Sequence, residues 1–210
     1  MRSFPFLAFG VGLAAAVSLS APETQAQRAA TGPPDWPCVQ RMVPEIGWGT
    51  IWGGPPIDQL EQPWWEDEEV GRIVRFATSR ETSQEEAVER VRTFAESLEP
   101  DEREERLTLL FSGLHERINR ERSRTIESIR RFSQSQVSRL EDVSELVDEL
   151  ETLRDSDAVR AETLERLEKQ LHWEQRTFQM RQQSLPALCE QPYLLEEKLS
   201  RMVRAIQAEM

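Results

Sequence analysis

Apolar residues recur three and four positions apart along most of the chain after residue 63, which is the spacing of one helix face. From residue 101 to residue 154 the chain contains no proline and a single glycine, Gly113. A helix over about 100–154 is roughly 80 Å long at 1.5 Å per residue. Its apolar stripe needs a second helix to cover it. The stripe consists of Leu107, Leu110, Phe111, Leu114, Ile118, Ile126, Ile129, Leu140, Val143, Val147 and Leu150.

The following segment supplies a matching stripe of apolar residues seven positions apart: Leu164, Leu171, Phe178 and Leu185. Leu167 and Leu188 occupy the intervening positions of the same seam. Sustained heptads of this kind indicate a coiled coil. On the first segment the register holds from Ile126 to Leu150 if Ser133 and Gln136 fill the seam. Because Asp155-Ser156-Asp157 favours a turn with an N-cap, residues about 100–154 and 157–187 are predicted to pair as an antiparallel hairpin.

Three shorter helices are predicted around this hairpin. One covers about 64–78, after Pro63 and with acidic residues in its first turn. The next covers about 83–98 and begins at a capping box, either Thr82 with Glu85 or Ser83 with Glu86. The last covers about 193–208, because Pro186 and Pro192 are expected to bend or interrupt the chain. The predicted fold is all-α, with the hairpin projecting from a small helical base.

Residues 27–63 form a segment of different composition, rich in glycine and proline. Such residues break helices and favour turns, yet disordered linkers lack aromatic rings. The segment and its edge carry five of the six tryptophans. We therefore expect an extended arm held against the base by buried rings, or an arm that displays some rings to a partner. The candidate partner-binding residues are Trp48, Trp52, Trp64, Trp65 and, on the return helix, Trp173.

The N-terminus has the layout of a secretory signal peptide. Arg2 precedes an apolar run over 4–21, and small residues at Ala21 and Ala26 offer two cleavage sites. The run is short for a membrane span, which needs about 20 residues, although an uncleaved anchor is the alternative. The predicted division is a signal peptide at 1–26, an arm at 27–63 and a helical domain at 64–210. We expect a periplasmic or secreted protein without a stable membrane span.

The chain is strongly acidic, with a formal net charge of −12, and cleavage after Ala26 removes Arg2 and Glu23 without changing that balance. Binding to nucleic acid requires clustered Lys and Arg, so a nucleic-acid partner is excluded. A content of 38% hydrophobic and 30% charged residues is typical of long helices that bury a single stripe.

Two cysteines, Cys38 and Cys189, lie in the mature part of the chain. In an exported protein an even pair favours a disulfide over two free thiols. If the hairpin turns near residue 156, Cys189 lies at the level of Ser123 on the other arm. Cys38 must then reach that level, which predicts that the arm lies along the hairpin.

The sequence lacks the motifs of catalysis and metal binding. His115 and His172 are the only histidines, and neither belongs to a zinc-ligand or nucleophile motif. The glycines at 47, 49, 53 and 54 lack the strand-then-helix context of a phosphate loop. We predict no catalytic residue, metal ligand or cofactor, and a protein that is not an enzyme.

Three segments carry a resemblance: Asp35-Trp36-Pro37-Cys38 through Pro44, Trp52-Gly53-Gly54-Pro55-Pro56-Ile57, and Cys189-Glu190-Gln191-Pro192. With these the chain resembles a group of uncharacterised exported bacterial helical proteins. The likeness covers most of the mature chain and implies a periplasmic setting and the cysteine pair. It implies no activity.

These observations favour a periplasmic interaction or adaptor protein that binds protein partners in the cell envelope through its stalk and its aromatic arm. A homodimer is possible, because a hairpin and a paired dimer bury similar stripes. The alternative is a periplasmic carrier or chaperone for a metal or a small ligand.

Overall fold

The computed structural model describes residues 33–155 and 161–210, and the predicted signal peptide and residues 156–160 lie outside them. Four α-helices follow two short 3₁₀ helices, Trp48–Thr50 and Ile57–Gln59. The α-helices are α1 (Glu68–Ala77), α2 (Gln84–Ser97), α3 (Arg103–Arg154) and α4 (Ala161–Gln207). No strand occurs among the described residues, so the all-α class is confirmed.

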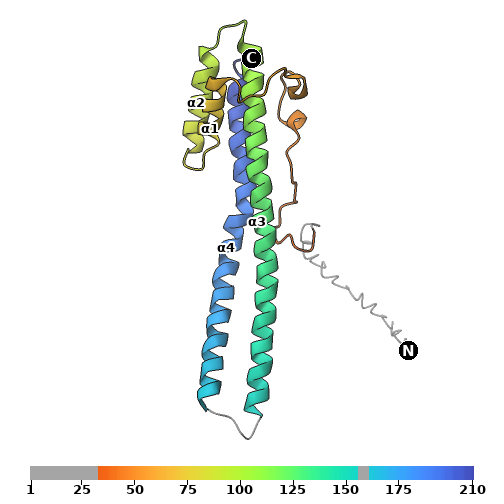
Figure 1. Ribbon diagram of the computed structural model, residues 1–210, viewed down its shortest axis with the longest axis vertical. Helices are drawn as coiled ribbons and strands as arrows, with labels where there is room; N and C mark the ends of the chain where they lie inside the picture. The colour runs from red at the N-terminus through yellow and green to blue at the C-terminus, as the bar shows by residue number, and fades with distance from the viewer. Residues whose placement is uncertain (1–32, 156–160) are drawn as a thin grey trace, which may run out of the picture.

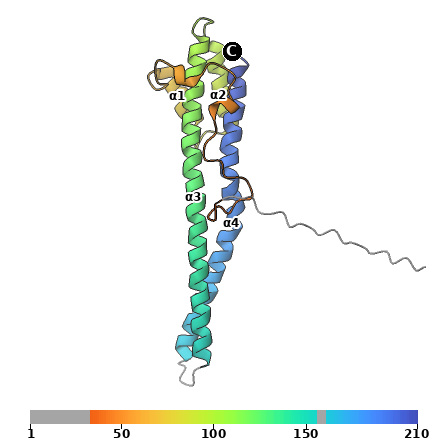
Figure 2. The same ribbon diagram turned by 90° about the vertical axis from the view of Figure 1, so that its right-hand side faces the viewer.

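Helices α3 and α4 lie side by side and run in opposite directions (Figures 1 and 2). Helices α1 and α2 pack against one end of this pair and form a base with it, and the far ends project as a stalk of two helices. We use "base" for α1, α2 and the adjoining ends of α3 and α4, and "stalk" for residues 130–154 and 161–186. The arm, residues 33–63, follows the outside of α3 and α4 toward the base.

The base contains the main hydrophobic core. Fully buried side chains from all four helices meet there, including Val74, Phe94, Phe111, Leu114 and Met202. Burying each of these side chains stabilises the fold by about 1.5–3 kcal/mol. Two smaller clusters follow along α3 and α4 beyond the base, one around the disulfide next to the stalk and one within the stalk around Leu146, Leu150 and Leu167. Beyond the base the two helices are thus held by two separate patches, not by a continuous core.

Helix starts follow the capping residues closely. Ser83 accepts from the amide of Glu86 at 3.2 Å, and the Glu86 carboxylate accepts from the Ser83 amide at 2.9 Å. This is a complete capping box, so the Ser83 alternative is correct. Helix α1 begins at Glu68, four residues later than predicted, because Asp67 is its N-cap and accepts from the amides of Glu69 and Val70.

The prediction of a separate helix after Pro192 is wrong, because α4 continues through Pro186 and Pro192 to Gln207. An internal proline removes one backbone hydrogen bond and costs about 3 kcal/mol. The penalty is offset because Pro192 is buried, and Cys189 and Leu199 hold the flanking turns against α3 and the base.

The predicted seam of α3 is correct at Ile126, Ile129, Gln136 and Leu150 and wrong at Leu140. Ile126, Ile129 and Gln136 are buried, whereas Leu140 is 54% exposed and Leu146 takes a seam position. An α-helix has 3.6 residues per turn and drifts by about 20° per heptad against a strict seven-residue repeat. That drift moves Leu140 out of the seam and Leu146 into it.

Candidate partner-binding surfaces

The arm is fixed to α3 by contacts along its length. The Asp35 carboxylate accepts from Arg130 at 2.8 Å, and the burial of this pair is partial. Arg122, which is 5% exposed, donates to the carbonyl of Val43. Nearer the base, the Asn119 side chain accepts from the amide of Ile46 at 2.9 Å. The arm therefore lies along α3 from the level of residue 130 to that of residue 119.

The cysteine pair links this arm to α4. The sulfur atoms of Cys38 and Cys189 lie 1.99 Å apart and the Cα atoms 5.5 Å apart, which is disulfide distance. The predicted pairing is confirmed. Trp36 packs in the same cluster with Ile126 and Ile129, and its indole N–H donates to the carbonyl of Gln40 at 2.7 Å.

Trp52 and Trp64 are anchors of the base, which is the first of the two roles expected for the rings of the arm. Trp52 is 6% exposed and stacks on Phe111 with ring centroids 4.2 Å apart. Trp64 is 8% exposed and donates its N–H to Glu116 at 2.8 Å. A buried indole satisfies both its apolar ring and its polar N–H in this way, which leaves no surface for a partner.

The other candidate tryptophans differ from these. Trp48 is half-buried and packs against the base core. Trp65 is 55% exposed and lies edge-on to Trp64 at 5.5 Å. Trp173 is 60% exposed on α4 in the stalk. Of the five residues predicted to bind a partner, only Trp65 and Trp173 present most of the ring to solvent.

An apolar groove, which the sequence did not indicate, lies between α3 and α4 where the arm meets the stalk. It holds about 160 Å³. Val137 and Leu140 on its α3 side are 58% and 54% exposed. We call this the mid-stalk groove; its lining residues are Pro37, Phe132, Ser133, Gln136, Val137, Leu140, Phe178, Gln182 and Leu185.

The floor of the mid-stalk groove contains polar groups without partners. Gln136 is 6% exposed, and neither atom of its side-chain amide has a hydrogen-bond partner. One turn further, Arg139 pairs with Glu174 across the two helices, yet its Nε atom is also buried and unpaired. Unpaired buried polar atoms are uncommon in native proteins and destabilise them. The middle of the stalk is thus a polar layer flanked by exposed apolar side chains.

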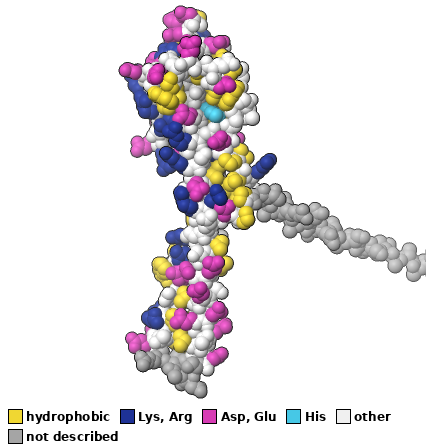
Figure 3. Space-filling view, turned by 45° about the vertical axis from the view of Figure 1, so that its right-hand side comes forward, with side chains coloured by type: hydrophobic (Ala, Val, Ile, Leu, Met, Phe, Trp, Pro, Cys, Tyr) yellow, Lys and Arg dark blue, Asp and Glu magenta, His cyan; other side chains and the backbone are white. Residues whose placement is uncertain are grey.

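Hydrophobic side chains also stand between charged ones along the stalk surface (Figure 3). On the outer side of α4, Trp173 and Met180 are 60% and 53% exposed and lie one heptad apart. Trp173 borders a shallow hollow of about 470 Å³ together with Lys169, His172 and Arg176. Apolar exposure in the stalk is therefore not confined to one helix.

The base has two hollows of its own. One, of about 880 Å³ between α1 and α2, is bordered by Phe76 and several glutamates. The other, of about 680 Å³, lies between the α1–α2 connection, α3 and α4. Lys198 borders the second hollow and donates to the carbonyls of Ser79 and Thr82 at 3.3 and 2.8 Å. Burial lowers the pKa of Lys198, and both contacts are structural because they fix the α1–α2 connection.

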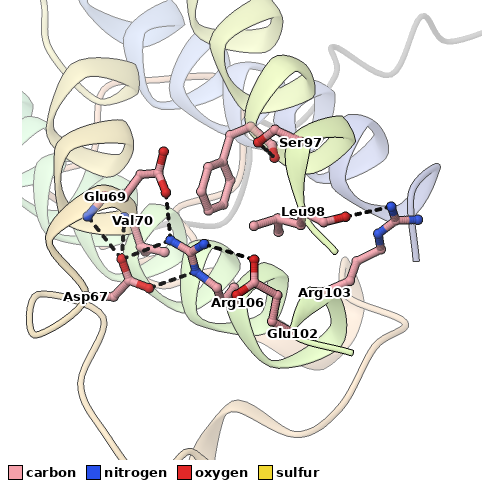
Figure 4. A network of polar contacts seen from close by, with 9 residues as sticks. Asp67, Glu69, Val70, Ser97, Leu98, Glu102, Arg103 and Arg106 are labelled. Atoms are coloured by element: carbon pink, nitrogen blue, oxygen red, sulfur yellow. Dashed lines mark hydrogen bonds and ion pairs between the residues drawn. The ribbon is translucent and has the colours of Figure 1, made fainter. Parts of the chain in front are cut away.

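An ion-pair network joins the first turns of α1 and α3 in the base (Figure 4). Arg106 donates to Asp67 at 2.9 Å, to Glu69 at 2.8 Å and to Glu102 at 3.3 Å. Burial opposes ionisation of Asp67, but hydrogen bonds from Arg106 and the amides of Val70 and Glu69 outweigh it and lower its pKa. The network holds the first turn of α1 on α3.

The two histidines lie in different surroundings. The Nε2 atom of His115 lies 2.7 Å from the Ile46 carbonyl and 3.0 Å from Asn119, so it helps to hold the arm. His172 is exposed on α4. Within residues 33–155 and 161–210, no group of three or more His, Cys, Asp or Glu side chains is placed to hold a metal ion. In the same part of the chain, no helix combines the length and apolarity needed to cross a bilayer.

These features define an all-helical protein whose candidate surfaces are apolar contact patches on a two-helix stalk. In comparison with known proteins, no family model, curated protein or solved structure matches the chain.

Proposed function

We propose that this protein is an exported, non-enzymatic interaction protein of the bacterial cell envelope, in which a disulfide-clamped base carries a coiled-coil hairpin as a binding stalk. The signal-peptide pattern at residues 1–26 and the cysteine pair support export. Partner binding is the role that best accounts for the surfaces of the stalk.

The observation that carries this proposal is the mid-stalk groove. Val137 and Leu140 each leave more than half of their surface in water, beside half-buried Phe132 and Phe178. Covering apolar surface stabilises a complex by about 25 cal/mol per Å² before the costs of association. A helix of a protein partner that inserts a branched or aromatic side chain is the ligand this groove accommodates, because apolar anchors in small pockets dominate such contacts.

The test is photocrosslinking from single positions of the full-length protein in the cells that express it. A photoreactive residue in place of Val137 is expected to yield a discrete adduct with one envelope protein. The same residue in place of Gln183, which is exposed on the outer side of α4, is the matched control and is expected to yield none.

A second variant makes the result specific to the groove. Leu140→Glu in the Val137 photocrosslinking protein is expected to abolish the adduct, because a carboxylate in the groove must be desolvated by any apolar partner. Equal labelling from both positions, or an adduct that survives Leu140→Glu, would show that the groove is not the contact surface.

A further inference from the structure

The outer face of α3 carries a stripe of polar residues whose charge changes sign halfway along. The stripe repeats at alternating steps of four and three residues, which keeps its members on one side of a helix. All eight members are exposed. In order they are Arg124, Ser128, Arg131, Ser135, Ser138, Asp142, Glu145 and Glu149.

This stripe is complementary to itself when it is turned end for end. Reflection about the point between Ser135 and Ser138 places Arg131 opposite Asp142. The same reflection places Arg124 opposite Glu149. The two serines at the centre face one another, and their small side chains allow two helices to approach closely. A parallel pairing would instead set like charges side by side.

Within one chain the acidic half of the stripe has no counter-charge. No ion pair involving Asp142, Glu145 or Glu149 occurs among the described residues. Three carboxylates spaced three and four apart repel each other on a helix surface. At the basic end, the ion pairs of Arg124 and Arg131 with glutamates of their own helix are long, at 3.9 and 3.7 Å, and Arg131 also donates to the Ser128 hydroxyl at 3.2 Å. Both halves therefore gain from an external partner of opposite charge.

We infer that the outer face of α3 binds the same face of a second copy of this chain, antiparallel and centred between Ser135 and Ser138. The stripe from Arg124 to Glu149 is about 38 Å long at 1.5 Å per residue. The resulting dimer has its two bases at opposite ends and leaves the mid-stalk groove of each copy on a different side of α3. This inference does not depend on the groove having a partner.

The stripe contains no apolar side chain, so the association is electrostatic and sensitive to salt. The screening length falls from about 10 Å at 0.1 M salt to about 3 Å at 1 M. Sedimentation equilibrium of the full chain is expected to show a dimer at about 0.05 M NaCl. The dissociation constant is expected to rise about tenfold or more at about 0.5 M NaCl.

Two charge-reversal variants test the surface itself. Arg124→Glu with Arg131→Glu makes every charged member of the stripe acidic. Asp142→Arg with Glu149→Arg makes the four opposed positions 124, 131, 142 and 149 basic and leaves Glu145, which lies opposite Ser128, unchanged. Each variant alone is expected to remain monomeric. An equimolar mixture of the two is expected to form a heterodimer, because every opposed pair is again of opposite sign.

A control separates the surface from net charge. Arg176→Glu with Arg181→Glu on α4 changes the net charge as much as the acidic variant does, and is expected to dimerise like the wild type. A monomeric wild type at low salt, self-association of either stripe variant at wild-type strength, or a mixture that does not associate would each overturn the inference.

Spin labels test the orientation. In the antiparallel dimer a label on Thr152→Cys lies opposite residue 121 of the second copy. The two labels are therefore about 46 Å apart along the helix axis at 1.5 Å per residue. Parallel helices would bring the two labels to about 10 Å, the usual interaxial distance, and that result would also overturn the inference.

Discussion

Gly113 lies where α3 passes beneath Trp64 and Val74, and its replacement gives a sharp test of the base core. A Cβ atom at this position would stand 2.7 Å from Val74 Cγ2 and 2.8 Å from Trp64 Cδ2. Both neighbours are buried, at 0% and 8% exposure, so neither can move without displacing others. Gly113→Ala therefore overpacks the core, which typically costs 1–3 kcal/mol.

The helix itself favours the opposite outcome. Replacing glycine by alanine inside a helix stabilises it by about 1 kcal/mol. We expect the packing penalty to win, with a net loss of about 1–2 kcal/mol in the free energy of unfolding. Urea denaturation of the oxidised protein, followed by circular dichroism, measures this quantity.

Gly71 in α1 is the matched control. A Cβ atom there would meet only the side chain of Arg75, whose nearest atom is the terminal Nη1 at 3.1 Å. That end can swing away into solvent. Gly71→Ala is therefore expected to raise the free energy of unfolding by about 0.5–1 kcal/mol. If both alanine variants were more stable than the wild type, the close packing of Trp64 and Val74 on α3 would be refuted.

Three further changes have defined outcomes. Replacing Cys38 and Cys189 by serine removes a link across 151 residues and is expected to lower the free energy of unfolding by about 5 kcal/mol on the loop-entropy model. Denaturation of the wild type with and without reductant checks this loss, and equal denaturation midpoints in the two conditions would contradict the expectation. In the folded protein the pKa of Asp67 lies below its ordinary value of 3.8. The ionised Asp67 carboxylate therefore stabilises the fold above pH 3.8, and this stabilisation is lost as the pH falls through the folded pKa. Asp67→Asn should lower stability at pH 7 by about 2 kcal/mol and flatten the acid limb of the stability profile, whereas an unchanged limb would contradict the Arg106 contact. Gln136→Leu replaces a buried unpaired amide by an apolar group and should stabilise the protein by about 1–2 kcal/mol; a loss in denaturant midpoint would show that the amide is satisfied.

The helices were predictable because the signals that start and stop them are local. The capping box at Ser83 and the long glycine-poor run before Arg154 mark helices in the sequence itself. The passage of α4 through Pro186 and Pro192 was not predictable from those signals. It depends on the disulfide and on burial against other helices, which are tertiary contacts that override a local preference.

The candidate surfaces were harder to predict than the fold. Tryptophans next to glycine and proline can be anchors or contacts, and only the partners Phe111 and Glu116 decide in favour of anchors for Trp52 and Trp64. The exposure of Leu140 arises from helical drift, which a strict heptad count does not include. The charged stripe of α3 is present in the sequence, but a search for apolar periodicity does not detect it because the stripe contains only polar residues.

Gln136 forms a polar layer in the seam between α3 and α4. A polar group inside a helical seam lowers stability, but it also disfavours shifted registers in which it would meet apolar side chains. Here it lies at the same level as exposed Val137, where the arm that Asp35 and Trp36 fix against α3 reaches the groove only with Pro37. The stalk is therefore least covered and least well paired at its middle. A partner that covers Val137 and Leu140 would exclude water from the one stretch where the two helices do not bury their own apolar stripe, which is why binding is expected there and not at the well-packed tip around Leu150.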